Sequence, residues 1–323
     1  MTHRRDFLVA AAAALAAGTS IAQTPYPDRP VRLIVPNPPG GPSDIVARLL
    51  SEHMRDSLGQ LLIVDNRPGA SGLIGTAFVA SAPADGYTVL VTSRSNHTMA
   101  PLVQKSTQVD PVRDLAPVGL AVRAVGMFVT NSQTGLRSMK DLIAFAKANP
   151  GKLNFGSAGI GATNHIAVEQ FKALAGIDIT HVPYKGSGPL ITGVMGNEVQ
   201  FALLDFASAQ VGTKSGSIVP LMQTGAKRLP AVPNVPTLAE GGFKDFDPSF
   251  WVGLAVPVKT APDVVRKLNA ALNDALSRTG FKAYAQANGW EVVGGAPKVL
   301  GDTVAADMAD FPAIIKKLDL RAG

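Results

Sequence analysis

Several stretches of the chain are rich in glycine, serine, threonine and asparagine and carry few charges. Backbone N–H groups in glycine-rich turns, together with small hydroxyl and amide side chains, can hold an anion by hydrogen bonds. An anion at one helix start gains only about 0.3–1 kcal/mol, whereas micromolar binding needs about 8 kcal/mol, so several stretches must converge and exclude water. The main stretches are 36–44, 93–97, 156–164 and 185–189.

Enzyme motifs fit these stretches poorly. The segment 156–164 is close to a dinucleotide-binding loop, but Asn164 stands where the third glycine belongs, and the predicted strand 179–184 ends without an acidic residue for a ribose. The nearest match to a nucleophile elbow, 69–73, lacks its final glycine. The chain has no cysteine, which excludes disulfides, thiolate metal sites and cysteine nucleophiles. We therefore expect no catalytic set and no cofactor.

The five histidines leave two questions open. His165 and Glu169 are four residues apart on a predicted helix and could share a metal ion, although such a pair is more often a surface contact or a cap. His97 and His165 both lie in or after polar loops, so each could contact a ligand. His53 and His181 are predicted to be structural or exposed.

The polar stretches follow predicted strands and precede predicted helices. The apolar strand 31–35 meets the rigid turn 36–42, then Ser43 and Asp44 offer a helix cap, and an amphipathic helix runs to Gly59. Repetition of this unit predicts an α/β fold with parallel sheets, whose ligands bind beyond the carboxyl ends of the strands. Further predicted strands and helices cover 61–64, 71–82, 88–92, 139–148, 154–155, 164–174, 179–184, 199–204 and 262–276.

Length and composition agree with a globular protein of about two domains. The chain has 323 residues, of which 46% are hydrophobic and 17% charged, with a formal net charge of +6. Basic residues are scattered and never run beyond pairs, whereas nucleic-acid binders concentrate them on one face. We expect no nucleic-acid partner, and the mild positive charge suits a small anion or solubility alone.

The amino terminus is predicted to be an export signal. Residues 1–22 have a basic start, an apolar run and small residues before a cleavage site after Ala22. Arg4 and Arg5 are typical of twin-arginine export, and Sec export stays open. No later apolar stretch is long enough to cross a bilayer, so we expect a periplasmic protein that does not insert into the membrane.

Six ordered motifs resemble the Bug/TctC family of extracytoplasmic solute receptors, which serve tripartite tricarboxylate transporters. The resemblance extends over essentially all of the chain that follows the signal. The motifs are Pro27-Asp28-Arg29-Pro30 with Pro39-Gly40-Gly41 and Asp44, Asp65-Asn66-Arg67-Pro68-Gly69-Ala70, Ala84-Asp85-Gly86-Tyr87-Thr88, Asn149-Pro150-Gly151-Lys152-Leu153, His181-Val182-Pro183-Tyr184-Lys185-Gly186 and Pro233-Asn234-Val235-Pro236-Thr237.

The resemblance implies a type II periplasmic binding protein with two Rossmann-like lobes, two crossovers and a ligand cleft between the lobes. The crossovers are expected near 122–127 and 246–252. Lobe 1 is then 23–124 plus 247–323, and lobe 2 is 125–246.

The resemblance also implies a function. The chain is expected to be a monomeric receptor that passes a small organic carboxylate to membrane transporter subunits. The ligand could be a dicarboxylate, an acidic amino acid or an aromatic acid. Two alternatives stay open, an orphan receptor that signals to a sensor kinase and a periplasmic hydrolase or transferase.

Positions matching the family's loops are the expected ligand-binding residues. Gly40 and Gly41 would let the backbone approach a carboxylate, and Asp44 would brace that loop or its waters or be a plain first-turn helix residue. Tyr184 and Lys185 belong to a matching turn, or else pack between the lobes. The other expected positions are Ser93, Ser95, Asn96, Ser157, Gly159, Ala162, Thr163, His165, Gly186, Ser187 and Asp205.

Two further expected site residues depart from the family's pattern. Arg94 stands where a small residue is common, so it could pair with a second ligand carboxylate or point outward into solvent. Phe206 stands where asparagine is frequent, so the pocket wall is expected to favour an apolar or aromatic acid.

Overall fold

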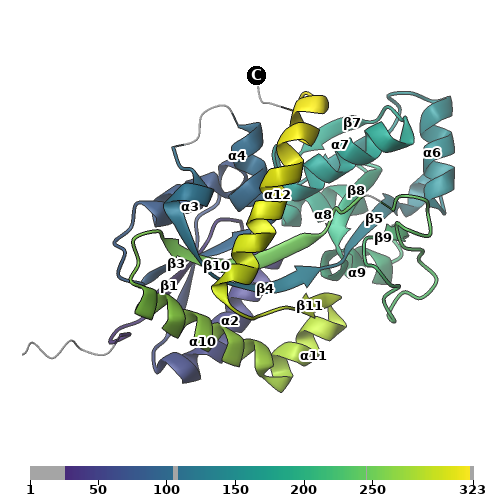
Figure 1. Ribbon diagram of the computed structural model, residues 1–323. Coiled ribbons are helices and arrows are strands. Elements are labelled where there is room, and N and C mark those ends of the chain that lie inside the picture. Colours follow the sequence, from purple (N-terminus) through teal and green to yellow (C-terminus); the bar gives the residue numbers. More distant parts are fainter. Residues whose placement is uncertain (1–25, 105–107, 245, 321–323) are drawn as a thin grey trace, which may run out of the picture.

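The computed structural model describes residues 26–104, 108–244 and 246–320. The predicted signal, 1–22, and its cleavage site lie outside these residues. Two β-sheets lie side by side, each covered by helices, and they form two lobes (Figure 1). No helix of the described residues is both long and apolar enough to cross a membrane.

Lobe 1 is built on a six-stranded sheet with the order β11-β4-β10-β3-β1-β2. Its strands are β1 (Val31–Val35), β2 (Leu62–Asn66), β3 (Thr88–Ser93), β4 (Leu115–Ala124), β10 (Phe250–Pro257) and β11 (Trp290–Val292). Its helices are α2 (Pro42–Leu58), α3 (Leu73–Ala80), α4 (Ala100–Val103), α5 (Pro111–Asp114), α10 (Pro262–Ser277), α11 (Thr279–Ala287) and α12 (Pro297–Lys317).

Lobe 2 is built on a five-stranded sheet with the order β7-β6-β8-β5-β9. Its strands are β5 (Gly126–Asn131), β6 (Asn154–Ser157), β7 (Thr180–Pro183), β8 (Phe201–Asp205) and β9 (Ile218–Gln223). Its helices are α6 (Met139–Ala148), α7 (Thr163–Ala175), α8 (Ser187–Met195) and α9 (Phe206–Lys214).

The chain crosses between the sheets twice. It leaves the first sheet with β4 and enters the second with β5 after the single residue Val125, and it returns between the end of β9 and the start of β10. The first passage lies within the expected range 122–127, and the second, 224–249, overlaps the expected range 246–252 at its end. We propose lobe boundaries at 124/125 and 246/247, with the final helices in lobe 1.

The predicted α/β fold is confirmed, and its sheets are mixed rather than parallel throughout. β1 pairs in parallel with β2 and β3, but β10 is antiparallel to β3 and β4. In lobe 2, β5 is antiparallel to β8 and β9. The antiparallel strands include those that begin after a crossover, because they enter from the neighbouring lobe rather than through a strand–helix–strand connection.

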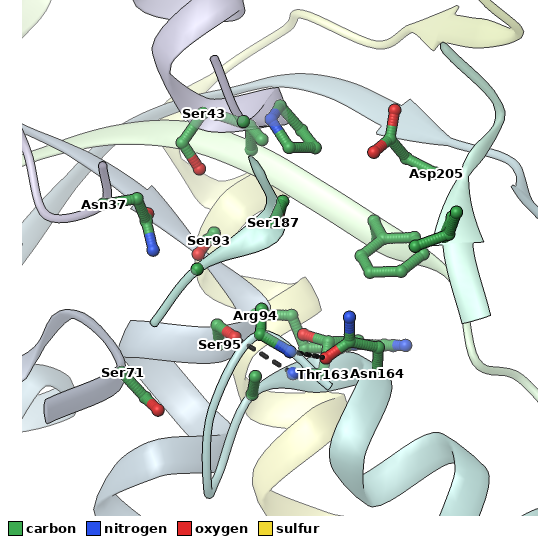
Figure 2. Close-up of a pocket in the computed structure, with 18 of the residues that line it drawn as sticks. Asn37, Ser43, Ser71, Ser93, Arg94, Ser95, Thr163, Asn164, Ser187 and Asp205 are labelled. Carbon is green, nitrogen blue, oxygen red and sulfur yellow. Dashed lines mark hydrogen bonds between the residues drawn. The ribbon is translucent and has the colours of Figure 1, made fainter. Parts of the chain in front are cut away.

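The start of α2 also differs from the prediction. The cap is Gly41 rather than Ser43 or Asp44, and Pro42 is the first helical residue. Proline is favoured there because its φ angle suits the helix and its missing N–H leaves no bond unmade. Gly41 itself is extended, with φ −85° and ψ 170°. With this geometry the start of α2 lines the space between the lobes, where Figure 2 shows Ser43.

Each lobe has its own apolar core, and a smaller cluster joins the lobes. The lobe 2 core stacks Phe128 on Phe201, with ring centroids 5.7 Å apart. The joining cluster buries Ile166 of α7 with Met99 of lobe 1 and with Phe311 and Ile315 of α12. Helix α12 crosses the face of the molecule beside both lobes (Figure 1).

Candidate functional site

A cavity, here called the inner cavity, lies between the two lobes where the loops after β1, β3, β6 and β8 meet. Its volume is about 80 Å³, room for about three water molecules or a small carboxylate group. Figure 2 shows its polar side chains gathered from both lobes. They are Asn37, Ser43, Ser71, Ser93, Arg94, Ser95, Thr163, Asn164, Ser187 and Asp205.

Three helices begin at the inner cavity. The caps of α2, α7 and α8 are Gly41, Ala162 and Gly186, and all three residues line the cavity. None of these caps provides a side-chain hydrogen bond. The first N–H groups of a helix have no acceptor within the helix, and they carry a partial positive charge. Apart from the Thr163 amide, which donates to the Ser95 hydroxyl, the cavity therefore offers amide donors from both lobes to an anion.

Hydrogen bonds join the lobes beside the cavity. The Ser95 hydroxyl accepts a hydrogen bond from the Thr163 amide at 2.9 Å, which links lobe 1 to the start of α7. The Ser71 hydroxyl donates to the Ile160 carbonyl at 2.6 Å. A closed cleft removes water and strengthens the remaining polar contacts to a ligand.

Asp44 holds the loop between β1 and α2 by hydrogen bonds. It is 2% exposed, and its carboxylate accepts hydrogen bonds from the Gly40 amide at 3.0 Å and from Asn66 Nδ2 at 2.9 Å. Burial alone would raise the pKa of Asp44, but hydrogen bonds from Arg48, Gly40 and Asn66 hold this pKa below its usual value. Neither Asp44 nor Gly40 lines the inner cavity, whereas Gly41 does. The structure thus brings Gly41 to the cavity and Asp44 to the loop's support.

Arg94 lines the cavity, but the expectation that it points into solvent is wrong. It is 6% exposed, and its guanidinium donates to both carboxylate oxygens of Asp307, at 2.8 and 3.2 Å. Its remaining donors reach Asp247 and the Ser249 carbonyl. Because these partners occupy the guanidinium, Arg94 is a support of the cavity wall and has little left for a second ligand carboxylate.

Asp205 lines the inner cavity, and its neighbour Phe206 does not. The Asp205 carboxylate caps α9 by accepting hydrogen bonds from the amide and hydroxyl of Ser208. Burial raises the pKa of Asp205. Phe206 is 2% exposed in the core of lobe 2, so the expectation that it forms the pocket wall is wrong. The residue after Asp205 enters a helix that turns its side chain away from the cleft.

The remaining expected residues divide into three groups. Ser93, Ser95, Ala162, Thr163, Gly186 and Ser187 line the inner cavity. Gly159, Tyr184 and Lys185 line an adjoining cavity nearer the surface. Asn96, Ser157 and His165 are buried behind the walls. Asn96 accepts from the Ser93 amide and hydroxyl at 2.8 and 2.6 Å, so it positions Ser93.

His165 packs behind the loop that precedes α7. Its ring stacks on His181 at 4.2 Å between centroids, and its Nδ1 accepts a hydrogen bond from the Gly161 amide at 3.2 Å. His181 in turn lies 2.7 Å from the Ser157 hydroxyl. The described histidines and acids form no group of three that could hold a metal ion. Both rings pack behind the loop and line neither the inner cavity nor the adjoining one.

We expect acid to destabilise the protein through its buried histidines. Burial lowers the pKa of His97 to about 4 and that of His165 to about 3. Both values lie below the unfolded value of about 6.5, so the unfolded chain takes up protons first and the free energy of unfolding falls as pH drops below 6.5. Each histidine contributes a slope of at most about 1.4 kcal/mol per pH unit. Urea unfolding at pH 7, 6 and 5 measures this slope.

The variants His97→Gln and His165→Gln should each flatten that slope between pH 6.5 and 5, whatever their stability at pH 7. An unchanged slope in both variants would contradict the assignment, since carboxylates titrate mainly below this window.

The sequence prediction missed the apolar wall of the cavity. Phe250, Trp251 and Val252 of β10 line it, together with Leu204 of β8. No local pattern placed β10 beside β3, because this contact depends on the second crossover. Asn37, Ser71 and Asn164 were also missed as lining residues. Asn37 and Asn164 lie in stretches that were recognised as polar, whereas Ser71 was placed at the start of a predicted helix.

The comparisons with known proteins agree with this geometry. Residues 46–320 match the family model TctC, described as the tripartite tricarboxylate transporter family receptor. The solved periplasmic binding protein BugD is similar, with 32% identity and a TM-score of 0.86 over 92% of this chain and 99% of its own.

Two similar solved structures contain acids. One is R. palustris Rpa4515 with adipate, at 32% identity and a TM-score of 0.87 over 91% of this chain and 98% of its own. The other is MatC from Rhodopseudomonas palustris with bound malate, at 28% identity and a TM-score of 0.85 over 90% of this chain and all of its own.

Proposed function

Because the chain belongs to the TctC family of periplasmic solute-binding receptors, we propose that it captures a small organic carboxylate in the inner cavity. The observation that carries this proposal is the convergence of three helix starts, from both lobes, on one cavity between the lobes. Amide donors that are fixed before binding hold a carboxylate without a large cost of ordering.

The electrostatics of the cavity wall support capture by amides rather than by a salt bridge. Among the described residues that line it, Arg94 is the basic one and Asp205 the acidic one, and Arg94 is already paired with Asp307. A carboxylate bound here therefore relies on helix starts and hydroxyl groups. The adipate and malate of the two similar structures are also carboxylates, which supports the ligand class.

We expect organic acids to stabilise the protein against heat. A ligand that binds only the folded state adds about 2.7 kcal/mol of stability at 100 times its Kd. A thermal-shift screen at neutral pH with monocarboxylates, dicarboxylates, acidic amino acids and aromatic acids measures this effect, with the corresponding amides and alcohols as uncharged controls. Mass spectrometry of ligand released from freshly purified protein identifies the acid independently.

The proposal fails if none of the acids shifts the melting temperature and the purified protein releases no acid. Stabilisation by the uncharged amides equal to that by the acids would also contradict capture of a carboxylate.

The proposal extends to location and partner. The family's receptors serve tripartite tricarboxylate transporters, and the predicted signal at 1–22 supports export to the periplasm. The proposed receptor hands its acid to the membrane subunits of such a transporter.

Amino-terminal sequencing of protein from the periplasm should give Gln23 as the first residue. Uptake of labelled acid by cells should be lost when the receptor gene is deleted.

A further inference from the structure

A second cavity, here called the outer cavity, adjoins the inner one. Its volume is about 590 Å³, roughly seven times that of the inner cavity. The two cavities share five lining residues, which are Asn37, Pro38, Ser71, Ala158 and Gly186. Residues of both lobes therefore form the edge along which the cavities meet.

The edge that the two cavities share, here called the neck, includes a contact between the lobes. A Cβ atom at Gly186 would lie 2.8 Å from Cγ of Pro38, so the proline ring lies directly against the Gly186 backbone. Gly186 has φ +106°, a conformation that favours glycine. Because Pro38 and Gly186 belong to opposite lobes, the degree of closure sets the width of the neck.

The walls of the two cavities are built from different groups. The inner cavity presents hydroxyl, amide and helix-start groups beside the apolar wall of β10. The outer cavity is walled largely by the rings of Pro36, Pro68 and Pro183, by Ile160 and by small residues, and Gln104 and Lys185 also line it. Tyr184 also lines it, and the Tyr184 hydroxyl donates to Glu198 at 3.0 Å rather than to a ligand. Ile160 is 45% exposed, so a large apolar side chain stands at this wall with much of its surface uncovered.

We infer that the outer cavity is a second subsite that takes the apolar tail of the acid whose carboxylate lies in the inner cavity. This inference rests on the proposed function and names the ligand class more closely, as an elongated acid with an alkyl or aryl tail. An acid with more than a few carbon atoms exceeds the inner volume and must extend through the neck. The proline rings are rigid, so a tail covers them without ordering flexible side chains.

A chain-length series tests the subsite. Isothermal titration with propanoate, butanoate, hexanoate, octanoate and 3-phenylpropanoate measures affinity and stoichiometry on the full mature chain. Each methylene transferred from water to an apolar wall gains affinity by up to about fourfold, and less where the wall is open. We expect octanoate to bind at least tenfold more tightly than butanoate, at one molecule per chain.

The variant Ile160→Asn removes the apolar wall without adding a charge. It should lower the ratio of octanoate to butanoate affinity at least threefold. The matched control is Ile63→Asn on β2, since Ile63 is 49% exposed and lines neither cavity. The control should keep the wild-type ratio, which excludes a general effect of an isoleucine-to-asparagine change.

The outcomes separate this inference from the proposed function. If butanoate and octanoate bind equally, or if Ile160→Asn leaves their ratio unchanged, the subsite is disproved while the receptor for small carboxylates stands. If no acid of the series or of the earlier screen binds, the proposed function itself is disproved. Binding of octanoate at several molecules per chain, equally in both variants, would show nonspecific adsorption and overturn the subsite.

Discussion

Replacing Asp307 with alanine should lower the free energy of unfolding by about 3 kcal/mol. Removal of one partner from a buried ion pair costs about 3–5 kcal/mol because the other charge stays buried without compensation. The side chains of Arg94 and Asp307 are 7% and 3% exposed. Asp307 also accepts hydrogen bonds from Trp251 Nε1 at 3.0 Å and from the Thr98 hydroxyl at 3.2 Å. We expect the lower end of the range because Arg94 keeps Asp247 as a partner.

The change Asp307→Ala should weaken ligand binding as well as lower stability. Arg94 follows β3, Trp251 lies on β10, and both line the inner cavity, while Asp307 belongs to α12. Asp307 thus fixes the wall of the cavity where the second crossover returns to lobe 1. Urea unfolding and isothermal titration with the acid that binds best measure the two effects on the same protein.

A double-mutant cycle and a surface control sharpen the test. In the Asp307→Ala variant, the added change Arg94→Ala should lower the free energy of unfolding much less than either change does in the wild type. The reason is that the buried charge left behind by Asp307→Ala is then removed. The control is Asp302→Ala on α12, which breaks the exposed pair between Lys298 and Asp302 and should change stability little. Equal effects of Asp307→Ala and Asp302→Ala would contradict the structural role given to Asp307.

The sequence predicts the helices and strands that are specified by residues close together in the chain. The apolar run at 31–35, the proline- and glycine-rich turn and the amphipathic helix that follows are β1, its loop and α2 in the structure. The strand at 88–92 and the helix at 139–148 are also found, as β3 and α6. These elements are specified by residues within a few positions of one another, so a pattern along the chain is sufficient.

Contacts between distant parts of the chain could not be predicted in this way. Arg94 and Asp307 are 213 positions apart, so nothing near Arg94 indicates that its charge is compensated inside the protein. The same limit applies to β10, which lies between β3 and β4 although it is far from both in sequence. The polar loops of the site were recognised, but the apolar wall that β10 contributes was not.

The missed orientation of Phe206 has a local cause. Asp205 ends β8 and at the same time caps α9, so the next residue is already helical. Its side chain therefore follows the helix into the lobe 2 core rather than continuing the alternation of the strand. A residue next to a site residue is thus not itself a site residue when a strand changes to a helix between them.

Replacing Gly41 with valine should weaken carboxylate binding at least about 100-fold while the protein stays folded. A Cβ atom at this position would lie 3.6 Å from the Ser187 hydroxyl of the other lobe, which is ordinary contact. The two further methyl groups of valine must then occupy part of a cavity of about 80 Å³. A hydrogen bond to a charged acceptor contributes about 1.5–3 kcal/mol, and displacing the carboxylate from the helix starts loses more than one such bond.

The backbone at Gly41 accepts a side chain, which makes the test selective for binding. Its φ of −85° and ψ of 170° lie in the extended region that β-branched residues favour, so we expect the free energy of unfolding to change by no more than about 1 kcal/mol. Gly41→Ala should give a smaller loss of affinity, because its single methyl makes only ordinary contact with Ser187.

The matched control is Gly301→Val on α12. Gly301 lines neither cavity, and a Cβ atom there would approach only Pro117, at 4.0 Å. This control should bind like the wild type. Isothermal titration of the three variants measures the order, which we expect to be Gly301→Val, then Gly41→Ala, then Gly41→Val, from tightest to weakest. Gly41→Val narrows the space between the start of α2 and the start of α8. Wild-type affinity in this variant would therefore mean that the carboxylate does not lie between those two helix starts.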